Sequence, residues 1–198
     1  GNSALRGGAF FQNQRSMSVV GGTFTNNIAQ DSSGRQVATT SGGAIAAIDA
    51  TVEVSGATFE GSKAYYGAAI SMISDADATL KNVTVQGCTS SSGAVSAIEQ
   101  SSLYMTNCTV RNNKGTYASA IFAATENNSF DSCTITGNSR VEGGTYYAAV
   151  YSGTKSFDAT LNFSGTTIID GNDNGADYAI LAGKSRLDSS DKVVIGDA

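Results

Sequence analysis

The sequence has no histidine, no proline and no tryptophan among its 198 residues. Without histidine, neither a Ser-His-Asp nor a Cys-His catalytic arrangement can form, and zinc loses its usual imidazole ligand. Proline removes a donor from a β-ladder and is confined to edge strands and bulges. The first absence excludes histidine-based nucleophilic catalysis, and the second favours a chain of uninterrupted strands.

Cysteine and charge are also scarce. The three cysteines, Cys88, Cys108 and Cys133, form no CxxC motif and cannot all pair within the chain. Charged residues make up 15% of the sequence and the net charge is −5, which argues against a nucleic-acid partner. With 40% hydrophobic residues, the composition is that of a folded chain with a buried core.

Long apolar runs are missing too. No run approaches the roughly 20 residues that span a membrane, and the N-terminus shows no signal-peptide pattern. We therefore expect this segment not to be embedded in a membrane. The chain starts inside a repeat, at residues 7–10 (GGAF), which predicts a fragment excised from a longer protein.

Glycine is abundant, with 23 residues, and a pattern of alanine followed by an apolar residue recurs along the chain. The pattern occurs at Ala9-Phe10, Ala44-Ile45, Ala69-Ile70, Ala94-Val95, Ala120-Ile121, Ala149-Val150 and Ala179-Ile180. Successive alanines are 35, 25, 25, 26, 29 and 30 residues apart. A period near 25 residues is typical of a solenoid in which each repeat forms one coil.

A second column places an apolar residue three positions before a small, mostly polar one. It comprises Phe24/Asn27, Phe59/Ser62, Val85/Cys88, Val110/Asn113, Ile135/Asn138 and Ile169/Asn172. Short runs that alternate apolar and polar residues indicate strands. We therefore predict an all-β fold, a right-handed parallel β-helix of about seven coils that forms a single domain over residues 1–198.

The asparagines of this column are expected to point inward at a sharp corner and to bond backbone groups of their own and neighbouring coils. The ladder would comprise Asn27, Asn113, Asn138 and Asn172. Ser62 and Cys88 interrupt it. Cys108 and Cys133 share a column and are expected as buried small residues. A disulfide between stacked coils is the alternative for that pair.

Two of the repeats also carry a family resemblance. Residues 42–45 read GGAI, and residues 24–27 read FTNN, an FxxN motif. This pair of motifs resembles the repeats of chlamydial polymorphic membrane proteins and of related bacterial β-helix adhesins and autotransporter passengers. The resemblance implies an extracellular passenger at the cell surface. We accordingly expect a non-enzymatic adhesin segment without a cofactor, which binds host-cell glycan or protein or associates with copies of itself.

Interruptions of the period predict where such binding occurs, because loops vary without disturbing the stack. Insertions lie between Asn27 and Ala44, between Asn138 and Ala149, and around residues 152–160. Six of the eight tyrosines fall in the corner shared by the first two insertions, namely Tyr65, Tyr66, Tyr117, Tyr146, Tyr147 and Tyr178. Their apolar faces and polar tips suit recognition of protein or sugar. Alternatively, they only pack on one another and seal the corner.

An acidic column supports a rival function. Acidic residues follow the alanine column at Asp49, Asp75, Glu99 and Glu126, with Asp77 nearby. Stacked carboxylates serve pectin-degrading enzymes of this fold as calcium ligands or as acid and base. The alternative is therefore a calcium-assisted polysaccharide lyase or hydrolase. A lyase also needs a basic residue in register, and no Lys or Arg has that spacing.

Two further patterns are weaker. Asp170, Asn172 and Asn174 match the opening of a calcium loop, although Leu181 replaces its bidentate Glu. An ordinary Asn/Gly turn is the other interpretation. An outward threonine column suggests an ice-binding solenoid as a lesser alternative, at Thr23, Thr58, Thr84, Thr109 and Thr134. The neighbouring outward column interrupts a flat threonine face with charge, at Thr25, Glu60, Gln86, Arg111 and Thr136.

Overall fold

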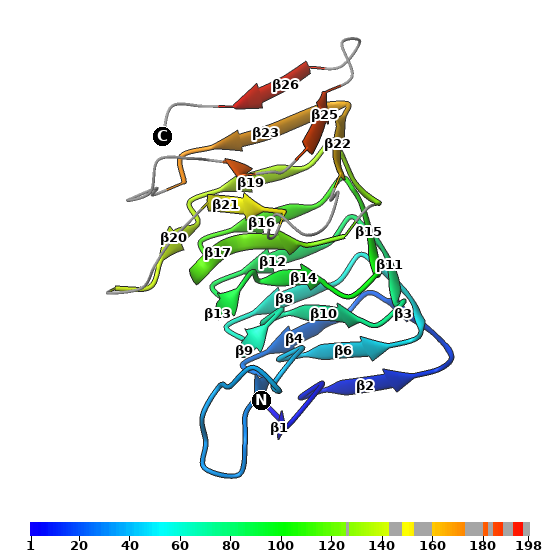
Figure 1. The fold of residues 1–198 in the computed structure, drawn as a ribbon, viewed down its shortest axis with the longest axis vertical. Coiled ribbons are helices and arrows are strands. Elements are labelled where there is room, and N and C mark those ends of the chain that lie inside the picture. The colour runs from blue at the N-terminus through cyan, green and yellow to red at the C-terminus, as the bar shows by residue number, and fades with distance from the viewer. Residues whose placement is uncertain are drawn as a thin grey trace.

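The structure, a computed structural model, describes residues 1–125, 127–142, 148–152, 160–172, 180–181, 184–187 and 192–195. Its strands form three sheets in which each strand pairs in parallel with its counterpart one coil away (Figure 1). The described ranges contain no helix, and hence none long and apolar enough to cross a membrane. The predicted all-β fold with stacked parallel coils is confirmed.

Sheet A forms two walls of the coil, because β17 (Lys114–Ala123) runs through both of them. We call them the β9 wall and the β10 wall. The β9 wall contains β1 (Ser3–Ala4), β5 (Ile28–Ala29), β9 (Lys63–Tyr66), β13 (Thr89–Ser92) and β20 (Ser139–Arg140). The β10 wall contains β2 (Phe10–Asn13), β6 (Ile45–Ile48), β10 (Ile70–Ile73), β14 (Val95–Ala97), β21 (Ala148–Tyr151) and β24 (Ile180–Leu181).

Sheets B and C have seven strands each, which confirms the predicted seven coils. Sheet B contains β3 (Ser16–Val20), β7 (Thr51–Ser55), β11 (Asp77–Lys81), β15 (Ser102–Thr106), β18 (Asn128–Asp131), β22 (Thr160–Ser164) and β25 (Lys184–Leu187). Sheet C contains β4 (Thr23–Thr25), β8 (Thr58–Glu60), β12 (Thr84–Gln86), β16 (Thr109–Arg111), β19 (Thr134–Thr136), β23 (Thr166–Asp170) and β26 (Lys192–Ile195).

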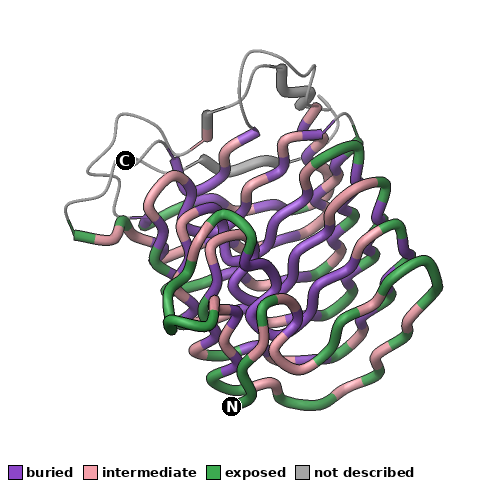
Figure 2. The backbone as a smooth tube through the Cα atoms, turned by 60° about the horizontal axis from the view of Figure 1, so that its bottom comes forward, coloured by how far each residue is buried: buried purple, intermediate pink, exposed green. Residues whose placement is uncertain are grey.

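Both predicted apolar columns are in register. In the β10 wall, Phe10 pairs with Ile45, and the pairing continues through Ile70, Val95, Ile121 and Val150 to Ile180. In sheet C, Phe24, Phe59, Val85, Val110, Ile135 and Ile169 pair in the same way. Figure 2 shows the buried residues along the inner course of the coils. Phe10, in the first coil, is 45% exposed, whereas the columns are buried from Ile45 to Val150 and from Phe59 to Ile169. Burial of these residues between stacked coils is the main stabilising contribution to the fold.

The corners are made by residues with left-handed backbone. Where sheet B meets sheet C, one such residue recurs in successive coils, at Gly21, Gly56, Asn82, Asn107, Ser132 and Gly165. Where the β9 wall meets the β10 wall, Gly42 has φ +61°, and a Cβ there would collide with the carbonyl oxygen of Ile45. Glycine is required at this tight turn, which accounts for the first residue of the GGAI motif.

The asparagine ladder is confirmed, with its interruption. Asn138 donates from Nδ2 to the Val110 carbonyl at 2.9 Å and to Oδ1 of Asn172 at 2.9 Å. Its Oδ1 accepts from the backbone and side-chain amides of Asn113, at 3.0 and 2.9 Å. Ser62, in the gap, has a buried hydroxyl without a hydrogen-bond partner.

The cysteines are buried and free, so the disulfide alternative is not what the structure shows. Cys108 and Cys133 lie one coil apart, joined through the N–H of Thr134, which donates to the Cys108 carbonyl at 2.9 Å. Burial raises the pKa of the Cys88 thiol to about 12, which keeps this thiol neutral and unreactive.

Candidate functional site

Three of the six predicted tyrosines lie together on the outer side of sheet A. Tyr65 and Tyr66 come from β9 and Tyr117 from β17, and all three are half-buried. The rings of Tyr65 and Tyr66 meet edge to face, with centroids 4.9 Å apart. Tyr65 also forms a side-chain hydrogen bond with Tyr117, two coils away. The other three, Tyr146, Tyr147 and Tyr178, lie outside the described residues.

Two further aromatic residues, not singled out from the sequence, extend this group. The ring centroid of Phe122 is 6.3 Å from that of Tyr66 and 5.4 Å from that of Tyr151. Each follows an inward residue of the alanine column by one position, so strand alternation already indicated that they face outward. We call the five residues the aromatic cluster: Tyr65, Tyr66, Tyr117, Phe122 and Tyr151.

The environment of the cluster keeps its phenols neutral. Burial is the largest cause that raises the pKa of Tyr65, and the neighbouring Tyr117 and Tyr66 raise it further. Burial also raises the pKa of Tyr66, and the Glu99 carboxylate adds to the effect. Both hydroxyls therefore stay protonated at neutral pH and can donate as well as accept hydrogen bonds.

The first predicted insertion, residues 30–41, returns to the sheet beside the cluster. The N–H of Tyr66 donates to the Thr40 carbonyl at 3.2 Å. Asp31 orders the loop, because its Oδ1 accepts from the N–H groups of Ser33 and Arg35 at 2.8 and 2.9 Å. These hydrogen bonds, that of the Ser33 side chain above all, lower the pKa of Asp31 to about 2. Residues 143–147 and 153–159, within the other two insertions, lie outside the described residues.

The acidic column forms where the β10 wall turns into sheet B. Asp49, Asp75 and Glu99 occupy this corner in successive coils and are exposed. Asp77 begins β11, and Glu126 lies outside the described residues. Within the described part of the chain, no three His, Cys, Asp or Glu residues gather closely enough to hold a metal ion.

The calcium-loop residues are divided between two roles. Oδ1 of Asn172 accepts two hydrogen bonds from Asn138, and its Nδ2 donates to the Ile135 carbonyl at 3.0 Å. Asp170 is exposed and accepts from the N–H of Gly171 at 2.7 Å. Asn174 lies outside the described residues, so a calcium site here stays a prediction.

The threonine column also stacks in register. Thr23, Thr58, Thr84, Thr109 and Thr134 pair along sheet C. In the neighbouring outward column, the guanidinium of Arg111 donates to Oε1 of Gln86 at 2.8 and 3.0 Å. The face therefore mixes threonine with charged side chains, as the sequence indicated.

The stacked parallel sheets and repeated inward columns define a β-solenoid. The chain belongs to the right-handed β-helix family, because its sequence matches the family description "Right handed beta helix region" over residues 2–188. The predicted right-handedness is thereby confirmed. Comparison with curated proteins found no match, and neither did comparison with solved structures.

Proposed function

We propose that this β-helix is a non-enzymatic segment of a bacterial surface adhesin, extracellular and displayed at the cell surface. The aromatic cluster is its contact surface for host-cell glycan, host-cell protein or a second copy of the chain. The observation that carries the proposal is the assembly of five half-buried rings from three strands on one outer face. The resemblance of residues 42–45 and 24–27 to repeats of chlamydial polymorphic membrane proteins and related adhesins supports this class.

The cluster has properties that suit binding. Its rings contact one another, so their side chains are already restricted and lose little entropy when a partner binds. Their apolar faces supply contact area, and their neutral hydroxyls supply hydrogen bonds. The ordered loop of residues 30–41 adds a polar rim beside Tyr66.

The test compares tyrosines inside and outside the cluster. Tyr66→Ala and Tyr117→Ala are expected to reduce retention of the labelled chain on cultured epithelial cells by about tenfold or more, as loss of a central aromatic contact does. Tyr104→Ala is the control, because Tyr104 is 40% exposed on sheet B, away from the cluster. Retention of this variant should match that of the parent chain.

Two further measurements interpret the result. Light scattering shows whether the chain self-associates and whether the cluster variants abolish that association. Circular dichroism melting shows whether the fold is intact. If the cluster variants melt earlier but are retained as well as the parent chain, the tyrosines only pack against one another and the proposal fails.

The acidic corner keeps one alternative open, a calcium-assisted polysaccharide lyase or hydrolase. The stacking of Asp49, Asp75 and Glu99 in successive coils is the observation that favours it. Incubation with acidic and neutral polysaccharides, with calcium and with chelator, tests this activity. Product release that Asp75→Asn or Glu99→Gln abolishes would replace the adhesin proposal.

A further inference from the structure

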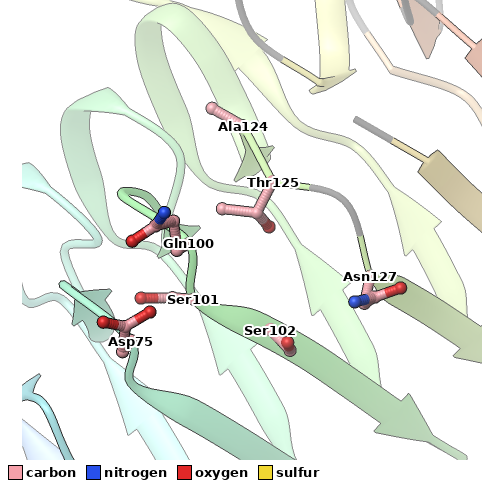
Figure 3. A pocket seen from close by; sticks show the side chains of 7 residues that line it. All are labelled: Asp75, Gln100, Ser101, Ser102, Ala124, Thr125 and Asn127. Carbon is pink, nitrogen blue, oxygen red and sulfur yellow. The ribbon is translucent and has the colours of Figure 1, made fainter. Parts of the chain in front are cut away.

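A pocket of about 380 Å³ opens at the corner between the β10 wall and sheet B (Figure 3). Its described lining comes from the turns of three successive coils and includes Asp75, residues 100–102, and residues 124, 125 and 127. This volume lies in the range of small-ligand sites, roughly 300 to 1,000 Å³. None of the five residues of the aromatic cluster lines this pocket, so the pocket is a separate candidate site.

The described lining is rich in hydrogen-bonding groups and has no cation. It offers one carboxylate, two carboxamides and three hydroxyls, from Asp75, Gln100, Asn127, Ser101, Ser102 and Thr125. An anionic ligand would meet a carboxylate and no positive charge among these residues. A neutral ligand with several hydroxyl groups matches both the donors and the acceptors.

Two serines in the lining differ in whether their hydroxyls already have a hydrogen-bond partner. Ser102 is 9% exposed, and its hydroxyl forms no hydrogen bond with any described residue. Ser101 is 1% exposed, and its Oγ accepts from the N–H of Ala76 at 3.1 Å. Figure 3 shows both serines between Asp75 and Asn127. The Ser102 hydroxyl lines the pocket without an intramolecular partner, so it can bond a ligand without breaking an existing hydrogen bond.

A second hollow extends the pocket along the solenoid axis. It has a volume of about 250 Å³ and shares Asp75 with the first. Arg15 and Asp49, of opposite charge, also line it. A ligand seated at Asp75 can therefore continue into the neighbouring hollow, which favours a chain of sugar units over a single one.

From this arrangement we infer that the corner pocket, called here the Asp75 pocket, binds a neutral oligosaccharide. The Asp75 carboxylate accepts hydrogen bonds from sugar hydroxyls, the Gln100 and Asn127 amides donate and accept, and Ser102 bonds a ring or hydroxyl oxygen. This site goes beyond the proposed function, because it is separate from the aromatic cluster and assigns a ligand class of its own.

The experiment uses an array of immobilised neutral oligosaccharides (glucans, mannans and galactans) beside uronic-acid oligosaccharides, followed by calorimetry with the soluble form of any bound sugar. We expect binding to neutral members, and a tenfold or greater loss of affinity in Asp75→Asn and Ser102→Val. Glu60→Gln is the control, because Glu60 is exposed on sheet C and lines neither the pocket nor the second hollow.

A third variant guards against a folding defect. Gln100 has φ +68°, a backbone conformation that glycine adopts freely, so Gln100→Gly removes the amide without strain. It should also weaken binding while melting at or above the temperature of the parent chain. Failure to bind any neutral oligosaccharide, or a preference for the uronic acids, would overturn the inference.

Comparison with the tyrosine variants separates the two proposals. Oligosaccharide binding that persists in Asp75→Asn but is lost in Tyr66→Ala would place the sugar at the aromatic cluster and overturn the pocket. Cell retention that depends on Tyr66, with oligosaccharide binding that depends on Asp75, would support both sites. If both tyrosine variants are retained on cells as well as the parent chain, the adhesin surface is refuted. Calorimetry with Asp75→Asn and Ser102→Val then decides whether the pocket binds sugar.

Discussion

At the scale of single residues, the asparagine column supplies hydrogen-bond partners to backbone groups at a sharp corner of the coil. Asn113 and Asn138 each donate from Nδ2 to a backbone carbonyl near the corner and to Oδ1 of the next asparagine in the column. Both are 0% exposed. Each side chain therefore links its own coil to its neighbours, and its removal leaves buried groups without partners on both sides.

Asn138→Ala is expected to lower the free energy of unfolding by roughly 3 kcal/mol, because several buried groups lose their partner at once. Urea unfolding followed by circular dichroism measures the change. Thr134→Ala, an outward substitution in the same coil, should cost much less. Equal losses in the two variants would contradict the role assigned to the ladder.

At the scale of strands, one outward column of the β10 wall changes from small polar to large aromatic side chains between successive coils. In the β10 wall, Ser71 and Ser96 pair in register and their hydroxyls lie 2.9 Å apart, both fully buried. The next residue of this column is Phe122, which contacts Tyr66 and Tyr151. Coils of the same backbone geometry can therefore present either a small polar or a large aromatic side chain.

Phe122→Ser is accordingly expected to leave the fold intact, because two coils already carry serine in this column. Stability should change by about 1 kcal/mol or less, while the near-ultraviolet aromatic signal and cell retention decrease. Phe130→Ser is the contrasting variant, since Phe130 is 0% exposed and stacks on Phe163. It should cost about 3 to 5 kcal/mol, as large-to-small core substitutions do. Equal destabilisation by both substitutions would show that Phe122 is part of the core.

The strand registers could be predicted from the sequence because one period fixes them all. Once Ile45, Ile70 and Val95 are aligned at 25-residue intervals, alternation decides which side chains face inward. The ladder and the buried cysteines follow from the same alignment. The same alignment also predicts that Phe122 faces outward.

The aromatic cluster and the Asp75 pocket could not be predicted from the repeat period, because both depend on local departures from it. Tyr65 reaches Tyr117 across an intervening coil, next to a register shift between β13 and β17. The Asp75 pocket arises where β15 pairs with β18 only from Leu103 onward, which leaves Ser102 unpaired on that side. Both features depend on corner geometry, which a repeat of apolar residues does not specify.

At the scale of the whole molecule, every coil contacts chiefly the coils before and after it, so the stack has no long-range closure. Deletion of residues 70–94 removes one full period and lets Ile45 pair with Val95. We expect the shortened chain to fold with an unchanged circular dichroism spectrum per residue and a lower melting temperature. Deletion of residues 70–82, half a coil, would align sheet A with sheet C and should abolish folding. A folded half-coil deletion would contradict the nearest-neighbour description.

The parallel register has a mechanical consequence for the proposed adhesin role. The hydrogen bonds between coils lie along the stacking axis, so tension along that axis acts on all coil boundaries in series. The coil at a loaded end has a neighbour on one side only and is expected to detach first. Each coil that peels away releases about 25 residues, or roughly 85 Å of extended chain. The molecule would therefore lengthen in steps under tension, and each step would dissipate mechanical energy as one coil unfolds.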